Sequence, residues 1–185
     1  MENTFKNYKY FIQTFGCQMN VHESEKVAGV LEKNGMTETK TTSDANIVVI
    51  NTCTIRENAD KKIESFIGNL KQLKKQGTLK CIVGFGCLVQ IEDKVISLKQ
   101  KFPFIDIVFG TMNLDNFETM LFAWAKDNKP KVELKESRTA KDIKDCYRTS
   151  GTNAWVNISF GCNNFCTYCI VPYVRGREIS RPMSD

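Results

Sequence analysis

The sequence of 185 residues lacks the features that would place it in or across a membrane. No apolar run approaches the roughly 20 residues that a transmembrane helix needs. Residues 1–15 carry lysines and polar side chains throughout, so the apolar segment of a secretory signal peptide is missing. The chain also has no internal repeat and no low-complexity tract apart from a short lysine-rich stretch. We therefore expect a folded protein of the cytosol.

The composition limits the architecture and leaves the choice of partner open. A chain of this length is enough for one full domain and the start of another, and 42% apolar residues can build an ordinary core. The net charge of +5 permits an acidic partner such as RNA without requiring one. Histidine is almost absent, because His22 is the only one in the sequence. It could serve as a fourth metal ligand five residues after Cys17, but a polar side chain at a helix start is the simpler interpretation.

Cysteine, by contrast, is abundant, with eight residues in the chain. In a small secreted protein such a number indicates a disulfide framework, but we expect a cytosolic chain, where thiols stay reduced. The cysteines therefore indicate metal or redox chemistry.

Three of these cysteines stand close together in the sequence. Cys162, Cys166 and Cys169 form a C-x₃-C-x₂-C triplet in one short segment. Zinc ribbons and ordinary ferredoxins use other spacings and four ligands. Three thiolates on a four-iron cluster leave one iron free to bind a small molecule, so the triplet predicts a reactive iron–sulfur site. Three buried structural cysteines are the alternative.

Hydrophobic patterning predicts an α/β fold. Apolar runs typical of strands alternate with helical patterns, and such βαβ units make a parallel sheet whose strands end at one edge. The expected strands cover 9–15, 45–52, 79–85 and 105–109, and the expected helices cover approximately 23–33, 57–76, 92–101 and 114–126.

Three further cysteines follow these strands. Cys17, Cys53 and Cys87 each come just after a predicted strand, so we expect them to face one crevice at the carboxyl edge of the sheet, where open α/β sheets bind ligands. This placement predicts a second three-thiolate site. The alternative is that cysteine, a small apolar residue, often ends a buried strand. Cys81 lies inside a strand pattern and Cys146 in a polar connector, and we expect neither to be a ligand.

The chain divides into three parts by composition. Residues 1–128 carry the alternating pattern, and residues 129–150 form a charged linker with room for one strand. Residues 151–185 begin a second unit, in which 153–160 alternate like a strand that leads into the Cys162 loop. Such a short piece rarely buries a core of its own. Either it continues in a longer protein or it packs against the first domain.

Four separate sequence blocks resemble the radical-SAM methylthiotransferases. These blocks span nearly the whole chain: Gly16-Cys17-Gln18-Met19-Asn20 with His22 to Glu25; Asn51-Thr52-Cys53 through Ala59; Gly86-Cys87-Leu88-Val89-Gln90; and Gly161 to Tyr173 with Arg175 to Glu178 and Ser180-Arg181. Gln18-Met19-Asn20 and Ile55-Arg56-Glu57 look more like the tRNA-modifying, MiaB-type branch than like the branch that modifies a ribosomal protein.

The resemblance implies a fold and a reaction. The fold is an open, flavodoxin-like parallel sheet followed by the first strand and cluster loop of a truncated radical-SAM partial (β/α) barrel. The reaction adds a methylthio group to C2 of N6-isopentenyladenosine beside the anticodon of tRNA. Members of the family continue through most of the barrel and a small RNA-binding domain, so we expect that this chain alone does not catalyse the reaction.

The resemblance also implies cofactors and partners. Two [4Fe-4S] clusters would be held by the two cysteine triplets, and no side chain would act as a catalyst. The cluster on Cys162, Cys166 and Cys169 would bind S-adenosyl-L-methionine, with Tyr168 and Ile170 near its adenosyl part, and split it into a 5′-deoxyadenosyl radical. The other cluster would deliver the sulfur. The partners would be tRNA and an electron donor such as a flavodoxin or ferredoxin, and the protein would be a monomer.

Other interpretations stay open at this stage. The substrate could be another tRNA nucleoside or a ribosomal protein. The chain could instead be an electron-transfer protein, or a zinc-stabilised RNA-binding module whose two four-thiolate sites recruit Cys81 and Cys146. Basic side chains could contact RNA phosphates, although a solvated helix face explains the lysines as well. The candidates are Lys61, Lys62, Lys71, Lys74 and Lys75 on one predicted helix. We expect Arg175, Arg177 and Arg181, after the cluster loop, to make contacts near the active site.

Overall fold

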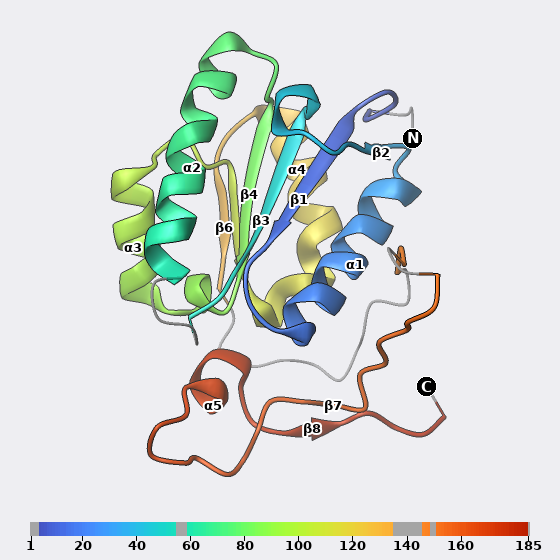
Figure 1. Cartoon of the computed structure of the whole chain (residues 1–185), viewed down its shortest axis with the longest axis vertical. Coiled ribbons are helices and arrows are strands. Elements are labelled where there is room, and N and C mark those ends of the chain that lie inside the picture. Colours follow the sequence, from blue (N-terminus) through green and yellow to red (C-terminus); the bar gives the residue numbers. More distant parts are fainter. Residues whose placement is uncertain (1–3, 55–58, 135–145, 149–150, 185) are drawn as a thin grey trace.

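The central feature of the computed structural model is a parallel β-sheet, shown in Figure 1. The structure describes residues 4–54, 59–134, 146–148 and 151–184. The sheet has six strands in the order β2-β1-β3-β4-β5-β6, and every neighbouring pair is parallel. The bounds are β1 Lys9–Thr14, β2 Thr37–Glu38, β3 Ile47–Thr52, β4 Cys81–Gly86, β5 Ile107–Gly110 and β6 Lys131–Glu133. The predicted α/β class and the parallel sheet are confirmed.

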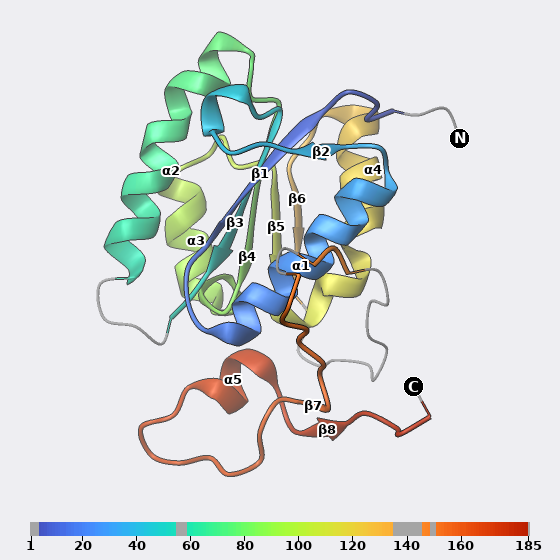
Figure 2. The ribbon, with the colours of Figure 1, turned by 45° about the vertical axis from the view of Figure 1, so that its right-hand side comes forward.

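Helices cover both faces of this sheet. Helices α1 and α4 lie on one face, and α2 and α3 lie on the other (Figures 1 and 2). The helices are α1 Gln18–Lys33, α2 Ala59–Gln76, α3 Glu92–Lys101, α4 Phe117–Asp127 and α5 Val171–Arg175, with 3₁₀ turns η1 Thr42–Asp44, η2 Leu88–Gln90 and η3 Thr111–Asn116. The four helices predicted for the first domain are present. Residues 55–58, which include the expected start of the second helix and part of the family-like block after Cys53, lie outside the described residues.

The core consists of two apolar layers that the central strands separate. All residues of β3 and β4 are buried, which explains their continuous apolar sequence. Because side chains alternate across a strand, Val49 and Val83 pack in one layer while Val48 and Ile82 pack in the other. The α/β class was readable from sequence because these two strands have no solvent-facing side.

The sheet extends beyond residue 128, where we expected the linker to begin. Strand β6 pairs in parallel with β5, with Val132 opposite Val108, so the one strand allowed for in that segment belongs to the main sheet. Of the remaining linker, residues 135–145 and 149–150 lie outside the described residues.

The strand predicted over residues 153–160 is mostly wrong. Only β7, Ser159–Phe160, is a strand, and it pairs antiparallel with β8, Ile179–Ser180. Alternation becomes a strand only where a neighbour continues the ladder of hydrogen bonds, and β8 pairs with Ser159 and Phe160 and reaches only the carbonyl of Ile158 before them. Val156 and Ile158 are accordingly 67% and 79% exposed. The first parallel barrel strand implied by the resemblance is therefore not seen in the described part of this segment.

The C-terminal segment packs against the first domain. It runs along α1 and then beneath the carboxyl edge of the sheet (Figures 1 and 2). The Tyr147 amide donates to the Glu25 carbonyl at 3.0 Å, and Lys26 Nζ lies 5.7 Å from the centroid of the Phe160 ring. These contacts bury the polar side of α1, including Glu23 and Lys26 at 1% exposure.

This packing explains a wrong helix boundary. We expected the first helix to begin at Glu23, but it begins at Gln18. Apolar periodicity detects only the face that meets the sheet, and here the charged face is buried as well, by the C-terminal segment. A search of the described helices found none with the length and apolar character needed to cross a membrane.

Candidate functional site

Three neighbouring strands deliver Cys17, Cys53 and Cys87 to one edge of the sheet. Cys53 and Cys87 directly follow β3 and β4, while Cys17 follows β1 after Phe15 and Gly16 and caps α1. β1 and β4 flank β3, and the ends are in register, since Thr14 pairs with Asn51 and Thr52 pairs with Gly86. The Cys87 amide donates to the Thr52 carbonyl at 3.1 Å. We call these cysteines the strand-borne triplet.

Two glycines allow the close approach of these strand ends. Gly16 and Gly86 have φ angles of +128° and +108°, which side chains rarely adopt. A Cβ atom on Gly16 would lie 3.0 Å from the Cβ of Cys53, and one on Gly86 would lie 2.6 Å from Asn51 Oδ1. A larger residue at either position would push the strand ends apart.

A buried polar network lies beneath the triplet. Asn20 Nδ2 donates to Asn51 Oδ1 at 2.7 Å and to the Thr52 carbonyl at 3.0 Å. In return Asn51 Nδ2 donates to the Asn20 carbonyl at 2.7 Å and to Ser24 Oγ at 3.0 Å. The Cys17 thiol donates to Asn20 Oδ1 at 3.3 Å. Both asparagines are 0% exposed, so the network fixes the start of α1 against β3.

A buried ion pair joins the strand-borne triplet to α5. Arg175 Nη1 donates to Glu23 Oε1 at 2.7 Å and Nη2 to Glu23 Oε2 at 3.2 Å. The Arg175 guanidinium also interacts with the Cys87 thiol and lowers its pKa, against the effect of burial. Burial alone would lower the pKa of Arg175, but the neighbouring Glu23 carboxylate and Cys87 raise it above its usual value. The guanidinium therefore stays charged beside the cysteines.

The chemistry of the strand-borne triplet fits a thiolate-bound group. Cys53 and Cys87 are buried at 1% and 0% exposure, and Cys17 is half-buried. Burial raises the pKa of Cys87 to about 11, while Arg175 acts in the opposite direction. A bound metal would displace that proton, and the adjacent guanidinium would offset the resulting negative charge.

The spacing of the sulfurs differs from that of a single metal ion. Among the described residues, only His22, Glu25 and Cys146 form a group of such ligands with all atoms within 4.8 Å of one another. In each cysteine triplet at least one sulfur–sulfur distance is therefore larger. One tetrahedral zinc would hold its thiolates about 3.8 Å apart, given zinc–sulfur bonds of about 2.3 Å. At least one pair of sulfurs in each triplet is thus farther apart than one zinc ion would hold them.

The second triplet, which we call the loop-borne triplet, lies on one tight loop. The Cys162 amide donates to the Gly176 carbonyl at 3.1 Å and the Cys169 amide to the Cys166 carbonyl at 2.9 Å. Gly161 has a φ of +72°, and a Cβ there would collide with the carbonyls of Gly176 and its neighbour. Cys166 is exposed and the other two cysteines are half-buried. Backbone hydrogen bonds rather than a core shape this loop.

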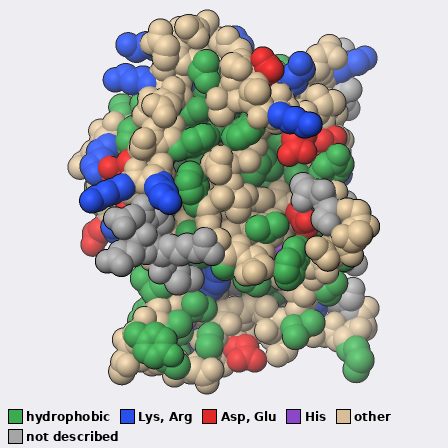
Figure 3. Space-filling model, viewed as in Figure 1, with side chains coloured by type: hydrophobic (Ala, Val, Ile, Leu, Met, Phe, Trp, Pro, Cys, Tyr) green, Lys and Arg blue, Asp and Glu red, His purple; other side chains and the backbone are tan. Residues whose placement is uncertain are grey.

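Aromatic residues flank the loop-borne triplet. Phe165 packs edge-on against Tyr173 at 5.8 Å, and Arg177 lies 5.1 Å from the Phe165 ring centroid. Tyr168 is 91% exposed and Ile170 is half-buried at the start of α5. Figure 3 shows apolar side chains on the surface of this lower part of the molecule. Tyr168 and Ile170 are accessible to a ligand, and their role with S-adenosyl-L-methionine stays a prediction.

Helix α5 docks the loop-borne triplet under the sheet. Thr111 Oγ1, just after β5, donates to the Val174 carbonyl at 2.6 Å, and the methyl carbon of Met112 lies 3.0 Å from the Cβ position of Gly176. With the Arg175 ion pair, these contacts place α5 directly beneath the carboxyl ends of the strands (Figure 2). The sequence alone did not connect the two triplets.

The two remaining cysteines lie elsewhere. Cys81 begins β4, six residues and therefore about 20 Å of extended chain away from Cys87. It is buried at 0% exposure, and burial raises the pKa of its thiol. Cys81 thus cannot join a site at the carboxyl edge, so the alternative with two four-thiolate zinc sites is wrong.

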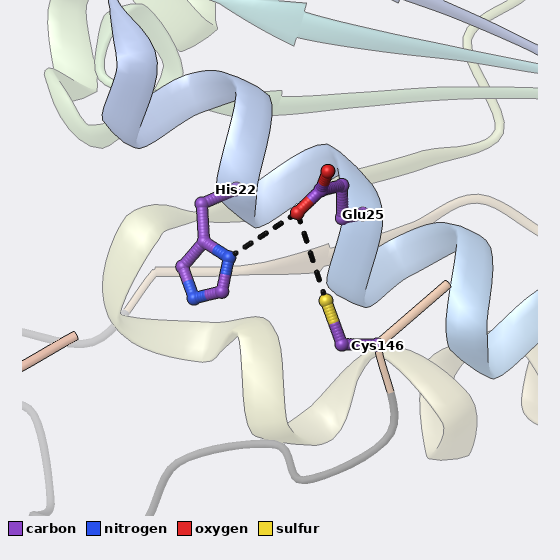
Figure 4. Close-up of side chains that lie close together, drawn as sticks. All are labelled: His22, Glu25 and Cys146. Carbon is purple, nitrogen blue, oxygen red and sulfur yellow. Dashed lines mark hydrogen bonds and ion pairs between the residues drawn. The ribbon is translucent and has the colours of Figure 1, made fainter. Parts of the chain in front are cut away.

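Cys146 lies against α1 (Figure 4). Its sulfur is 3.8 Å from Glu25 Oε2, which is 3.5 Å from His22 Nδ1. Burial and the Glu25 carboxylate raise the pKa of Cys146, which favours the protonated thiol. Glu25 thus contacts both Cys146 and His22, and these contacts hold Cys146 against α1.

The predicted basic residues divide into two sets. Lys74 is an internal contact, because its ammonium group pairs with Asp106. Lys61 and Lys62 instead line a surface groove of about 450 Å³ beside Phe15, two residues before Cys17. Figure 3 shows Lys and Arg side chains on the side of the molecule where α2 and α3 lie. Lys71, Lys75 and Arg177 are exposed as well, but Lys61 and Lys62 are the ones that line this groove.

Several residues of the site carry no signal of their own in the sequence. Glu23 and Asn20 look like ordinary polar residues at a helix start, and their pairing partners lie 152 and 31 residues away. Only the four-block resemblance includes them. Arg175 was expected near the site, and the structure places it beside Cys87.

Comparison with known proteins assigns the segment that carries these motifs to a family. The sequence profile described as "Uncharacterized protein family UPF0004" matches residues 9–110, the segment from β1 to the end of β5. Curated relatives include enzymes named tRNA-2-methylthio-N(6)-dimethylallyladenosine synthase. The one from Thermoanaerobacter sp. (strain X514) is 43% identical over 187 residues, which is 100% of this chain and 39% of that protein.

Two further relatives carry the same name. That of Acetivibrio thermocellus is 43% identical over 192 residues, covering 98% of this chain and 38% of its own length. That of Halalkalibacterium halodurans is 44% identical over 179 residues, covering 96% and 33% respectively. The chain thus spans about two fifths of the length of these relatives or less. The profile match covers more than half of the chain and includes all of the strand-borne triplet, so this chain belongs to the UPF0004 family.

Proposed function

We propose that this chain is part of a tRNA methylthiotransferase that adds a methylthio group to C2 of N6-isopentenyladenosine next to the anticodon by radical-SAM chemistry. The observation that carries the proposal is that Cys17, Cys53 and Cys87 follow three adjacent strands, while α5, which follows the loop of the second cysteine triplet, is docked beneath those strand ends. Relatives that bear the corresponding enzyme name over the whole chain support it.

Each triplet would hold one [4Fe-4S] cluster with one iron left without a protein ligand. When bound, the clusters would supply electron transfer to S-adenosyl-L-methionine and the sulfur for the new C–S bond. The cysteines of this chain would act as ligands and not as nucleophiles. Burial of Cys53 and Cys87 would exclude water from one side of the first cluster.

The remaining residues would bind and orient. Tyr168 and Ile170, next to the exposed loop, would contact the adenosyl part of S-adenosyl-L-methionine. Lys61 and Lys62 would attract tRNA phosphates toward the edge of the sheet that holds Cys17. An electron donor such as a flavodoxin or ferredoxin would reach the loop-borne triplet, which lies at the surface.

The first experiment measures what the two triplets bind. The chain is purified without oxygen, reconstituted with iron and sulfide, and compared with two variants that replace either triplet by alanine. We expect about eight irons and eight acid-labile sulfides in the parent and about half in each variant, because each four-iron cluster carries four of each. Zinc without sulfide would reject the proposal. In the reduced full-length protein, clusters that never yield 5′-deoxyadenosine from S-adenosyl-L-methionine would indicate an electron carrier.

The second experiment identifies the substrate. We expect tRNA from cells that lack the full-length gene to lose the methylthio nucleoside and to accumulate N6-isopentenyladenosine. The full-length gene should restore the modification, and the same gene with Cys53→Ser should not. If the tRNA nucleosides stay unchanged, mass spectrometry of the ribosomal proteins tests the other branch of the family.

A further inference from the structure

Arg175 occupies an unusual position, because it is buried between the two triplets. It is the last residue of α5, which begins two residues after Cys169, and only 6% of its surface is exposed. A buried guanidinium is costly unless its charge and its five N–H groups find partners. The interaction partners of the Arg175 guanidinium therefore indicate its role.

These partners come from the strand-borne side of the molecule. Glu23, 1% exposed and one turn and a half after Cys17, takes one hydrogen bond on each carboxylate oxygen, at 2.7 and 3.2 Å. The guanidinium also interacts with the Cys87 thiol at the end of β4. Arg175, which follows the loop-borne triplet in the chain, therefore interacts both with Glu23 on α1 and with Cys87 at the end of β4.

The geometry requires arginine. Two parallel hydrogen bonds to one carboxylate need a planar fork of donors, which leaves the guanidinium charge beside Cys87. Lysine could supply the charge but not this fork. Glu23 also matters for charge, because it neutralises the guanidinium while Cys87 carries no charge.

We propose that Arg175 is a positioning residue that couples the two sites, holding the Cys87 sulfur in place and setting the charge around the group bound to the strand-borne triplet. This inference rests on the proposed function. A hydrogen bond and a positive charge next to a ligand sulfur favour the more reduced, more negative form of an iron–sulfur cluster. Arg175 would thereby raise the reduction potential of the first cluster, and Glu23 would moderate that effect.

The coupling is also mechanical. Loss of the contact to Cys87 should loosen α5, and binding at the strand-borne triplet should tighten it, because coupling between two sites acts equally in both directions. The loop-borne triplet would then be docked most firmly when the first site is filled.

The test uses the chain with Cys162, Cys166 and Cys169 replaced by alanine, so that only the first cluster is present. Its midpoint potential and its electron paramagnetic resonance spectrum are measured for this parent, Arg175→Lys and Glu23→Gln. We expect a lower potential and a changed spectrum for Arg175→Lys, and a higher potential for Glu23→Gln. Arg177→Lys is the matched control, because Arg177 packs on Phe165 and should leave the potential of the first cluster unchanged.

Hydrogen exchange of the metal-free chain gives a second readout that needs no cluster. Arg175→Lys should speed the exchange of the α5 amides relative to the parent, and Arg177→Lys should not. Unchanged potentials together with unchanged exchange in Arg175→Lys and Glu23→Gln would overturn the inference while leaving the proposed function intact. A parent that binds no cluster at all would instead reject the proposed function.

Discussion

The strand-borne and loop-borne triplets each bring three thiols together, but they do so in different ways. Cys17, Cys53 and Cys87 lie far apart in the chain, two of them are buried, and three parallel strands assemble them. Cys162, Cys166 and Cys169 lie within one loop, and Cys166 is exposed. The first arrangement depends on the whole sheet and the second on a few backbone hydrogen bonds. The comparison teaches that one kind of ligand set can be either a product of the fold or a local motif.

The largest expected difference comes from the glycine before a cysteine in each triplet. Gly86→Val would place a branched side chain at a φ of +108° against Thr52 and Asn51, inside the core. We expect about half of the iron to be lost and stability to fall by about 3 kcal/mol, as strain and overpacking add. Iron analysis and urea unfolding check both effects.

Gly161→Val is the matched change in the loop-borne triplet. It would also remove about half of the iron, because the loop cannot close. Urea unfolding should change by less than about 1 kcal/mol, since the loop contributes little to the core. Equal destabilisation by the two valine variants would contradict the contrast between a fold-dependent and a local site.

A smaller effect is expected from the polar network that supports only the strand-borne triplet. Asn51→Ala would remove the hydrogen bonds of Asn51 with Asn20 and Ser24 in a fully buried position, so Asn20 Nδ2 would keep only the Thr52 carbonyl. We expect stability to fall by about 2 kcal/mol, the usual cost of a buried polar group left unsatisfied. The first cluster should be lost more readily on exposure to a chelator, while the absorbance due to the second stays. Equal rates of loss from both sites would show that the network serves the general fold only.

The next effect concerns substrate rather than stability. Lys61→Glu with Lys62→Glu reverses the charge in the groove beside the strand-borne triplet. In the full-length protein we expect tRNA affinity to fall by roughly tenfold and its salt dependence to weaken, as phosphate contacts are lost. Lys99→Glu with Lys101→Glu on α3 is the control of equal charge change. An equal loss of affinity in that control would assign the effect to net charge instead of the groove.

The smallest effect is expected for an ion pair that touches neither triplet. Lys94 and Asp60 pair at 2.6 Å on the surface, and this hydrogen bond raises the pKa of Lys94. A raised lysine pKa stabilises the fold below the ordinary lysine value of 10.5, and this contribution is lost as the pH rises through the folded-state pKa. Lys94→Met should therefore cost less than about 0.5 kcal/mol at pH 7, given the exposure of the pair, and change neither iron site. Thermal unfolding at pH 7 and at increasing pH above 10.5 checks this, because the difference between the two proteins should shrink as the pH rises.

The sequence by itself determined the fold class and the candidate ligands. Strands β3 and β4 are buried on both faces, so their apolar runs could not be mistaken for half-exposed strands. Because Cys53 and Cys87 directly follow these runs, the sequence also placed them at the carboxyl ends of the strands. The loop-borne triplet was readable directly, because its spacing is local.

Only the tertiary structure decided how the two triplets relate. The short β7 in place of a longer strand and the pairing of Glu23 with Arg175 depend on how residues 146–184 fold and pack, and the start of α1 at Gln18 depends on the network between Asn20 and β3. Apolar periodicity reports a side chain's preference for the core, but it does not report which charged groups become buried together. A contact across 152 residues between two charged side chains leaves no local pattern, because its energy exists only once both partners have lost their water.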